Sequence, residues 1–324
     1  MAADTQKQVL VTGGEGFIGY NLVKRLVEMD NIGQVIVVDN YITSKPKVRL
    51  PKTVVLEMDI CGLSFVDYMC THYTHIDEIY HLASLASPTA YKNHLLETLD
   101  VGYTGTKNVL DLCVHYGAKL LYTSTSEVYG DALEHPQRET YYGNVNPYGE
   151  RSNYDISKRI GETLIYNYRK LYNIKTCIAR VFNTYGPYMS LYDGRIVTEI
   201  AKAILDKTTL TIYGDGSQTR SMCYVGDTVD MLIELMDSEF SSPVNVGNDH
   251  EITINELVDI VLDTYSCHFN ERVKINIRYT PIEKDDPKQR RPCTQLNKEV
   301  LGEREFTDLK KGILQTLLYF KENV

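Results

Sequence analysis

The sequence lacks tryptophan, closely paired cysteines and any apolar run long enough to cross a membrane. A membrane-spanning helix needs about 20 consecutive apolar residues, so we expect no transmembrane segment. The seven cysteines are scattered, odd in number and never spaced as CxxC. This pattern favours free thiols in a reducing compartment and argues against disulfides and a metal site. Because the start, from Met1 to Thr5, has no apolar signal region, we expect a cytoplasmic location.

Positive charge is also scarce. The 324 residues include 34 Lys and Arg against 43 Asp and Glu, which gives a formal net charge of −9. Such a balance argues against nucleic acid as a partner, because a phosphate backbone attracts basic surfaces. With 43% hydrophobic residues, the chain is long enough to form one large α/β domain or two lobes around a full core.

The sequence does contain a glycine-rich turn between an apolar run and an amphipathic stretch. The run at 9–12 leads into Gly13, Gly16 and Gly19, and a helical apolar pattern follows over 20–27. In a strand–turn–helix of this kind, the first glycine allows a tight turn and the second admits a pyrophosphate. The third lets the helix pack against the strand. The helix N-terminus then offers unpaired N–H groups to the phosphates, so the pattern predicts a dinucleotide site.

An acidic residue follows the next apolar run. The run at 34–38 ends in Asp39, 26 residues beyond Gly13. An acid about 20 residues after such a turn accepts hydrogen bonds from the ribose hydroxyls of the dinucleotide. A carboxylate there also repels a 2′-phosphate, so the sequence predicts NAD rather than NADP as the cofactor.

Apolar, β-branched runs alternate with helical patterns through the first half of the chain. Further strands are predicted at 53–57, 78–82, 119–123 and 175–181, with long amphipathic helices at 94–116 and 155–172. This alternation predicts an α/β fold with a Rossmann-type, doubly wound parallel sheet.

From Asn183 onward, Gly-Pro and Asp-Gly pairs separate shorter elements. A helix is predicted at 195–205, a strand at 210–213, and helices near 228–236 and 254–265. We therefore expect an NAD-binding domain over residues 1–182 and a smaller C-terminal α/β substrate-binding lobe over residues 183–324. Folds of this type bind the substrate at the carboxyl ends of the strands, between the lobes.

Two stretches carry candidate catalytic residues. Ser124-Thr125-Ser126-Glu127 follows a predicted strand, where parallel sheets present reactive groups, and Tyr154 and Lys158 share one helix face at i and i+4. Tyrosine has an ordinary pKa of about 10, which a nearby ammonium and an oxidised nicotinamide would lower. Tyr154 is then predicted to remove a hydroxyl proton while hydride leaves the same carbon.

These motifs resemble the extended short-chain dehydrogenase/reductase family of nucleotide-sugar enzymes, nearly from end to end. The likeness is carried by His81-Leu82-Ala83-Ser84, Ser124 to Gly130, Tyr154 to Lys158, Arg180 to Pro187, Asp193-Gly194-Arg195, Gly216 to Arg220, and Asp285 to Pro292. Within the family, the sequence is most similar to the branch that decarboxylates UDP-glucuronate.

The resemblance implies roles for individual residues. The implied catalytic residues are Thr125, Ser126, Glu127, Tyr154, Lys158 and Arg290. The implied contacts to NAD are Gly13, Gly16, Phe17, Ile18, Asp39, Asn40, Asp59, Ile60, Leu82, Ala83, Ser84, Tyr154, Lys158 and Val181. The implied contacts to the UDP-sugar are Asn183, Arg195, Tyr213, Arg220 and Arg290. The guanidinium groups in this last set match phosphate oxygens.

The pair Ser126-Glu127 separates branches of the family. Related 4,6-dehydratases carry Asp-Glu, because an acid must protonate the departing 6-hydroxyl, and related 4-epimerases lack the glutamate. A Ser-Glu pair is typical of the decarboxylases. The resemblance therefore implies oxidative decarboxylation of UDP-glucuronate through a UDP-4-keto intermediate, which yields UDP-xylose, UDP-4-keto-pentose or both. A 4,6-dehydratase, a 4-epimerase and a non-catalytic NAD-binding sensor remain alternatives, and the protonation state of Glu127 stays open.

The sequence departs from its relatives at a few positions. Glu15 stands where relatives usually have a small residue, Tyr20 replaces a common serine, and Ile156-Ser157 replaces Glu-Gly. No glycine of the turn is lost, so we expect NAD binding to survive, and we expect positions 156 and 157 to face away from the substrate. Relatives pair their two long helices in an intermolecular four-helix bundle, which implies a homodimer through residues 94–116 and 155–172.

Overall fold

The computed structural model describes residues 6–47, 49–281 and 289–323. Within these residues the largest sheet is parallel throughout, in the order β11-β6-β5-β4-β1-β2-β3. Its strands are β1 (Lys7–Thr12), β2 (Ile32–Asp39), β3 (Thr53–Glu57), β4 (Glu78–His81), β5 (Lys119–Thr125), β6 (Thr176–Val181) and β11 (Pro243–Val246). The predicted doubly wound parallel sheet is therefore confirmed.

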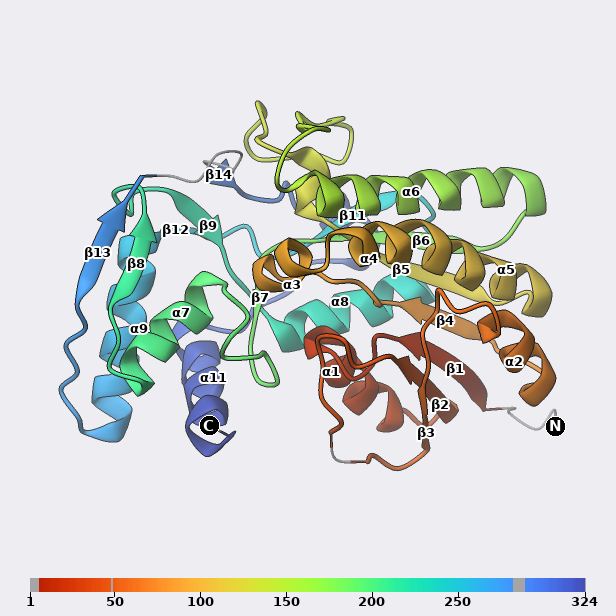
Figure 1. The fold of residues 1–324 in the computed structure, drawn as a ribbon, viewed down its shortest axis with the longest axis horizontal. Helices are drawn as coiled ribbons and strands as arrows, with labels where there is room; N and C mark the ends of the chain where they lie inside the picture. The colour runs from red at the N-terminus through yellow and green to blue at the C-terminus, as the bar shows by residue number, and fades with distance from the viewer. Residues whose placement is uncertain (1–5, 48, 282–288, 324) are drawn as a thin grey trace.

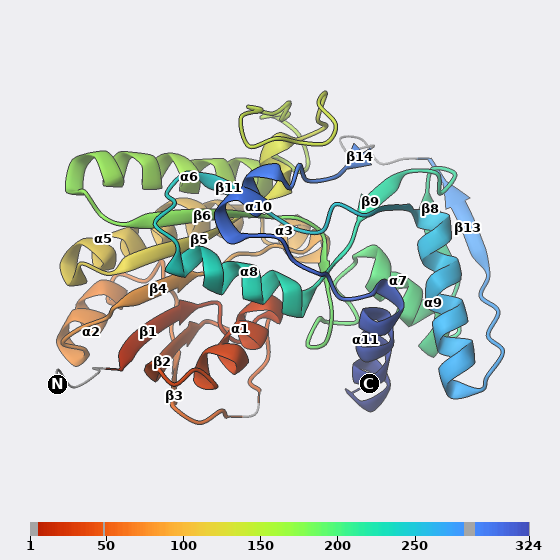
Figure 2. The same ribbon diagram turned by 180° about the vertical axis from the view of Figure 1, so that it is seen from behind.

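Helices cover both faces of this sheet (Figures 1 and 2). One face packs on α2 (Phe65–His72), α5 (Thr106–Tyr116) and α6 (Ser152–Tyr172), and the other on α1 (Phe17–Val27) and α8 (Val225–Asp237). Successive residues of β1 point into the two layers in turn, since Val9 and Val11 belong to the core with α1 whereas Leu10 belongs to the core with α5. Continuous apolar strands thus follow from burial on both sides.

The sheet has a switch point between β1 and β4. The chain runs outward from β1 to β3 and then returns to β4 on the other side of β1. Thr12 and His81 are paired at the carboxyl ends of these two strands, and Thr12 Oγ1 lies 2.7 Å from His81 Nδ1. Open α/β sheets bind their ligands at such a point, so the sheet order positions the glycine turn for a ligand.

A second lobe lies beside the carboxyl ends of the strands (Figure 1). Its separate hydrophobic core is formed by α7 (Ile196–Leu205), β8 (Leu210–Tyr213), α9 (Ile254–Phe269) and α11 (Leu309–Asn323), and β13 (Ile277–Thr280) pairs with β8. A small sheet of β12 (Glu251–Thr253), β9 (Thr219–Ser221) and β14 (Gln289–Arg290) extends from it. The predicted elements at 195–205, 210–213 and 254–265 thus correspond to α7, β8 and α9.

The structure differs from the predicted boundary at residue 183. Helix α8 packs in the same core as α1, and β11 pairs with β6 at the edge of the large sheet. Helix α10 (Gln295–Leu301) also packs against this core. The chain therefore crosses between the lobes more than once, because β6 needs a neighbouring strand and α1 needs a helix beside it to bury its apolar residues.

The stretch at 94–116 is helical, as predicted, but not as one regular helix. It consists of α4 (Leu95–Asp100), a π-helical turn at Val101–Gly105 and α5. A Cβ on Gly102 would lie 2.5 Å from the Ser157 Cβ, so this turn packs closely on α6. The small side chain of Ser157 permits that contact and is buried there, outside the cleft described below.

No helix in the described ranges combines the length and the apolar character needed to cross a bilayer.

Candidate active site

A cleft of about 1170 Å³ is lined by residues at the carboxyl ends of the parallel strands and by residues of the second lobe. Pockets for one small ligand are typically about 300–1,000 Å³, so this cleft has room for a dinucleotide and a second ligand. Every residue that the sequence assigned to catalysis, cofactor binding or substrate binding lines it. Of the Asp285–Pro292 motif, residues 285–288 lie outside the described residues.

The glycine turn leaves the N-terminus of α1 open. Gly13 has a φ of 71°, and a Cβ on Gly19 would lie 2.1 Å from the Gly13 carbonyl oxygen. Glycine is therefore required at both positions for the helix to approach the turn. Gly16 caps the helix without a side-chain hydrogen bond, and the first turn holds no acidic residue. The free N–H groups and the positive end of the helix dipole fit a pyrophosphate.

Asp39 organises the segment beside this turn. Its Oδ2 accepts a hydrogen bond from Glu15 N at 3.0 Å, and its Oδ1 accepts from Tyr41 N at 3.0 Å and from Ser44 Oγ at 2.8 Å. A carboxylate has about four acceptor sites, so Asp39 retains capacity for a ribose hydroxyl. The turn, the helix end and this carboxylate together fit a dinucleotide such as NAD.

The predicted catalytic groups meet at the end of β5. Thr125, Tyr154 and Lys158 are all buried. A hydrogen bond from the Thr125 side chain lowers the pKa of Tyr154, but burial outweighs it and raises that pKa to about 12. Lys158 Nζ donates to the Thr123 carbonyl oxygen at 2.8 Å, and burial lowers the pKa of Lys158 to about 7.

The direction of the Tyr154 shift corrects the sequence-based expectation. A lysine at i+4 was expected to favour the phenolate, but the phenol is buried and Lys158 donates to a backbone carbonyl instead. Removing a charged phenolate from water costs more free energy than its interactions with the nearby groups recover. The base role that the sequence predicts for Tyr154 would therefore require further positive charge in the cleft, such as that of an oxidised nicotinamide.

Glu127 lies between two guanidinium groups. Arg290 Nη2 is 2.8 Å from Glu127 Oε1, and Arg151 Nη2 is 2.9 Å from Glu127 Oε2. Burial alone would raise the pKa of Glu127, but Arg290 and Arg151 together outweigh it and hold the pKa below its usual value. The protonation state that the sequence left open is therefore that of a carboxylate.

The strand that carries Arg290 is held in place by Gln137. This buried side chain accepts a hydrogen bond from Arg291 N at 2.8 Å through its Oε1, and the backbone N–H of Gln137 donates to the Arg291 carbonyl oxygen at 2.9 Å. Within β14, Arg290 is also paired with Arg220 of β9. Two cations therefore stand side by side facing Glu127.

The predicted substrate residues surround the same group. Asn183 Oδ1 accepts from Arg290 Nη1 at 3.4 Å, while Asn183 Nδ2 is buried and has no hydrogen-bond partner. Arg195 donates to the Ala86 carbonyl oxygen at 2.9 Å and lowers the pKa of Tyr154, as a nearby positive charge should. Tyr213 lies partly exposed at the edge of the cleft. A buried amide donor and several guanidiniums suit a ligand with anionic oxygens.

Sequence reasoning missed two residues that line this cleft and one that is buried beside it. Arg151 binds Glu127, and Tyr91, in α3 (Pro88–Asn93), stacks on Tyr154 with ring centroids 5.2 Å apart. Asp155 is buried, and burial together with the charge of Glu127 raises its pKa to about 7. Arg151 stands three residues before Tyr154, so helical spacing could have indicated it, whereas Tyr91 comes from a distant segment without such a signal.

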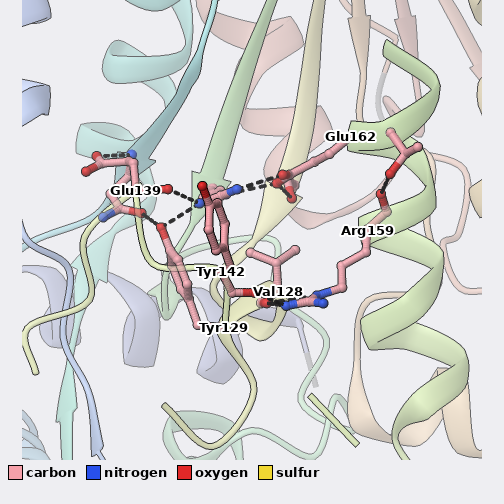
Figure 3. A network of polar contacts seen from close by, with 10 residues as sticks. Val128, Tyr129, Glu139, Tyr142, Arg159 and Glu162 are labelled. Atoms are coloured by element: carbon pink, nitrogen blue, oxygen red, sulfur yellow. Dashed lines mark hydrogen bonds and ion pairs between the residues drawn. The ribbon is translucent and has the colours of Figure 1, made fainter. Parts of the chain in front are cut away.

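A buried polar network supports the end of β5 from behind (Figure 3). Ser124 Oγ donates to Glu162 Oε1 at 2.6 Å, and Glu162 accepts two hydrogen bonds from Arg180 at 2.9 and 2.7 Å. Arg180 also donates to the Tyr129 hydroxyl at 3.0 Å, which donates to Asn245 Oδ1 at 2.7 Å. The network joins β5, β6, β11 and α6, so it fixes the strand end that carries the catalytic groups.

Arg159 extends this support to the segment before α6. Its guanidinium donates to the Val128 carbonyl oxygen at 2.8 Å and to that of Tyr142 (Figure 3). Because Arg159 follows Lys158 on α6, the helix that carries Tyr154 is tied to the turn that carries Glu127. The two segments that carry the predicted catalytic residues are therefore held in one arrangement.

Comparison with known proteins identifies the family. Residues 9–247 match the NAD dependent epimerase/dehydratase family. The chain is 42% identical over 313 residues to UDP-glucuronic acid decarboxylase 6 of Arabidopsis thaliana, covering 94% of this chain and 86% of that protein. It is 40% identical over 320 residues to UDP-glucuronic acid decarboxylase 1 of Danio rerio, covering 98% and 74%.

The fold also matches a solved structure. The UDP-glucose 4-epimerase of Thermotoga maritima, solved with UDP-glucose, superposes with a TM-score of 0.88 at 26% identity and covers 97% of this chain and 99% of its own. The family match spans more than half of the chain and includes the glycine turn, Thr125, Glu127, Tyr154 and Lys158. The chain belongs to the NAD dependent epimerase/dehydratase family and is similar over nearly its whole length to UDP-glucuronic acid decarboxylases.

Proposed function

We propose that this protein is a cytoplasmic enzyme that decarboxylates UDP-glucuronate with bound NAD, and that it releases UDP-xylose together with some UDP-4-keto-pentose. The observation that carries this proposal is the ionised Glu127, held by Arg151 and Arg290 next to Ser126. The relatives at 40–42% identity that bear the name UDP-glucuronic acid decarboxylase support the same substrate.

The first step is oxidation at C4 of the sugar. NAD, held by the glycine turn and Asp39, would supply the hydride acceptor and the source of the hydride that is returned. Tyr154 takes the proton of the C4 hydroxyl, and Thr125, which bonds Tyr154, orients that hydroxyl. Tyr91 stacks on Tyr154 and limits its ring to one orientation. The product of this step is a 4-keto uronic acid, in which the carboxylate is β to a carbonyl.

The second step breaks the C5–C6 bond. Its electron pair enters the C4 carbonyl to give an enolate, and C6 leaves as carbon dioxide. Thr125 and Tyr154 stabilise the enolate oxygen by hydrogen bonds. Arg290 lies where it can bind the carboxylate, while Asn183 Nδ2 and the guanidiniums of Arg195 and Arg220 bind the nucleotide diphosphate. A proton then adds to C5, and hydride return to C4 completes UDP-xylose.

The alternatives fit this site less well. A 4,6-dehydratase needs a neutral acid to protonate a departing hydroxyl, but residue 126 is serine and Glu127 is held ionised. Asp155 has a raised pKa, but it is not among the described residues that line the cleft, so it is not placed to be that acid. A non-catalytic sensor would have no need of a buried Tyr154, Thr125 and Lys158 at one point. The reaction of a 4-epimerase does not require Glu127 or its two arginine partners beside the sugar.

A homodimer is part of this proposal. Helices α4 and α5 both pack beside α6 (Figure 1), and these helices, with the π-helical turn between α4 and α5, expose large apolar side chains. These are Leu95, Leu96, Tyr103, Val114, Tyr166, Leu171 and Tyr172. A second copy of the same helices would bury them in a four-helix bundle.

Product analysis tests the function. Purified protein is incubated with NAD and UDP-glucuronate labelled with ¹³C at C6, and NMR follows the label and the nucleotide sugars. We expect labelled carbon dioxide, UDP-xylose without added reductant, and a smaller amount of UDP-4-keto-pentose with NADH. Tyr154→Phe should form none of these. Formation of the C4 epimer with its carboxylate intact would assign an epimerase, and no reaction would refute the proposal.

A further inference from the structure

The two departures from the usual glycine turn are both buried. Glu15 is 4% exposed and Tyr20 is also 4% exposed. The Glu15 carboxylate accepts a hydrogen bond from Lys47 N at 2.7 Å through Oε2. Lys47 belongs to the segment after β2, which wraps around Asp39 through Tyr41 N and Ser44 Oγ. Glu15 therefore ties the ribose-binding segment to the glycine turn at a second point.

Lys47 continues this contact toward α1. Its ammonium donates to the Glu15 carbonyl oxygen and lies 5.4 Å from the centroid of the Tyr20 ring. Cations within about 6 Å of an aromatic face are attracted to it. A serine at position 20, as in relatives, offers no such face.

Tyr20 in turn contacts the segment that leads into the second lobe. Its ring centroid is 4.6 Å from that of Tyr188, and the Tyr188 ring is 4.9 Å from that of Tyr319 on α11. Asn21 Nδ2 holds the same segment by donating to the Pro187 carbonyl oxygen at 3.0 Å. In Figures 1 and 2 this segment, between β7 (Thr184–Tyr185) and α7, lies between α1 and α11.

The backbone at Tyr188 shows how firmly this contact is held. Its φ is 70°, a left-handed conformation that side chains other than glycine adopt only when their surroundings impose it. Tyr20, Tyr319 and Lys24, whose Nζ is 5.0 Å from the Tyr188 ring centroid, are those surroundings. Glu15, Lys47, Tyr188 and Tyr319 also line the cleft.

We propose that Glu15, Lys47, Tyr20 and Tyr188 form a latch that holds the dinucleotide in the cleft. The latch joins the ribose-binding segment, the glycine turn and the second lobe, so release of the cofactor requires the segment after Asp39 to lift and these contacts to break. It is a determinant of cofactor retention beyond the glycines and Asp39.

The latch also bears on the product ratio. This consequence rests on the proposed function, because hydride return to the 4-keto-pentose requires NADH to stay bound after carbon dioxide leaves. A longer residence of NADH favours UDP-xylose, and a shorter one favours UDP-4-keto-pentose. A tenfold change in one of the two competing rates changes the product ratio tenfold.

The rate of NADH dissociation tests the latch without any sugar substrate. The protein is loaded with NADH, mixed with excess NAD in a stopped-flow instrument, and the loss of bound NADH fluorescence is followed. We expect Tyr20→Ser and Lys47→Ala each to increase the dissociation rate about tenfold, and Glu15→Ala to act in the same direction. Tyr148→Ser, at an exposed position outside the cleft, should match the wild type.

Lys47→Ala removes no core side chain, so it decides the outcome if Tyr20→Ser lowers the melting temperature. Dissociation rates within twofold of the wild type for Lys47→Ala and Glu15→Ala would overturn the latch. The product ratio with UDP-glucuronate is measured separately. A latch effect on NADH without any decarboxylation would leave this inference standing and refute the proposed function.

Discussion

Arg290 and Glu127 are joined by an ion pair, 2.8 Å between Nη2 and Oε1, although 163 residues of chain separate them. Both side chains are nearly buried, with 11% and 10% exposed. The pair connects β14, at the edge of the small sheet, with the 3₁₀ turn Ser126–Tyr129 that follows β5. The two lobes therefore meet at the Glu127 carboxylate, which directly follows Ser126.

The first prediction concerns the stability of this pair. Arg290→Met should lower the free energy of unfolding by about 2 kcal/mol, because the buried Glu127 carboxylate loses one of its two guanidinium partners and keeps only Arg151. The double variant Arg290→Met with Glu127→Gln should recover a large part of that loss. Urea denaturation measures both. A loss in the double variant equal to the sum of the losses in Arg290→Met and Glu127→Gln alone would show that the two residues are not coupled.

The second prediction concerns cofactor choice. Asp39→Ala should weaken NAD binding and reduce discrimination against NADP, because the carboxylate that meets the ribose is lost and the 2′-phosphate is no longer repelled. Isothermal titration with NAD and with NADP gives both dissociation constants. A preference for NAD equal to that of the wild type would place the ribose elsewhere.

The third prediction is a pH-dependent effect of Asp155. Burial raises its pKa from 3.8 to about 7, so the folded protein binds more protons than the unfolded chain between these values. The stability contributed by the protonated carboxyl is present below pH 4 and is lost as the pH rises through 7, by at most about 1.4 kcal/mol per pH unit. Asp155→Asn should therefore stabilise the protein most above pH 7. Urea denaturation at pH 5, 7 and 8 tests this against Asp67→Asn, an exposed control.

Lys158 should show the opposite pH dependence. Burial lowers its pKa from 10.5 to about 7, so the folded protein binds fewer protons than the unfolded chain between pH 7 and 10.5. The cost of burying the ammonium is full below pH 7 and is relieved as the pH rises. Lys158→Met should stabilise the protein at pH 6 and progressively less at pH 8 and 9. An increase in the free energy of unfolding that does not vary with pH would mean that burial does not destabilise the Lys158 ammonium.

The last prediction concerns assembly. Light scattering should give a mass twice the 37.0 kDa of one chain at micromolar concentrations. Tyr166→Glu on the exposed face of α6 should shift the protein toward the monomer, because a charge in the apolar bundle is not solvated. Leu133→Glu, an exposed apolar position away from these helices, is the matched control. A monomeric wild type would refute the bundle.

Local patterns in the sequence determined much of this protein. The glycine turn, Asp39 at the end of β2, and Tyr154 and Lys158 on one helix each depend on short spacings, so they were predictable without a structure. The same holds for the alternation of strands and helices, because period and apolar content are set residue by residue. The small lobe was also predicted, because Gly-Pro and Asp-Gly pairs separate shorter elements after Asn183.

Only the tertiary structure decided which distant residues meet. Arg151 and Arg290 reach Glu127 from separate segments, and their positive charges favour its carboxylate form. Gln137 comes from a third segment and holds the strand that carries Arg290. The return of β11 and α8 to the first lobe also depends on the packing of the whole sheet. The raised pKa of Tyr154 follows from burial, which is a property of all the atoms around a group. Glu15 and Tyr20, visible as departures in the sequence, acquired a role only when folding placed Lys47 and Tyr188 against them.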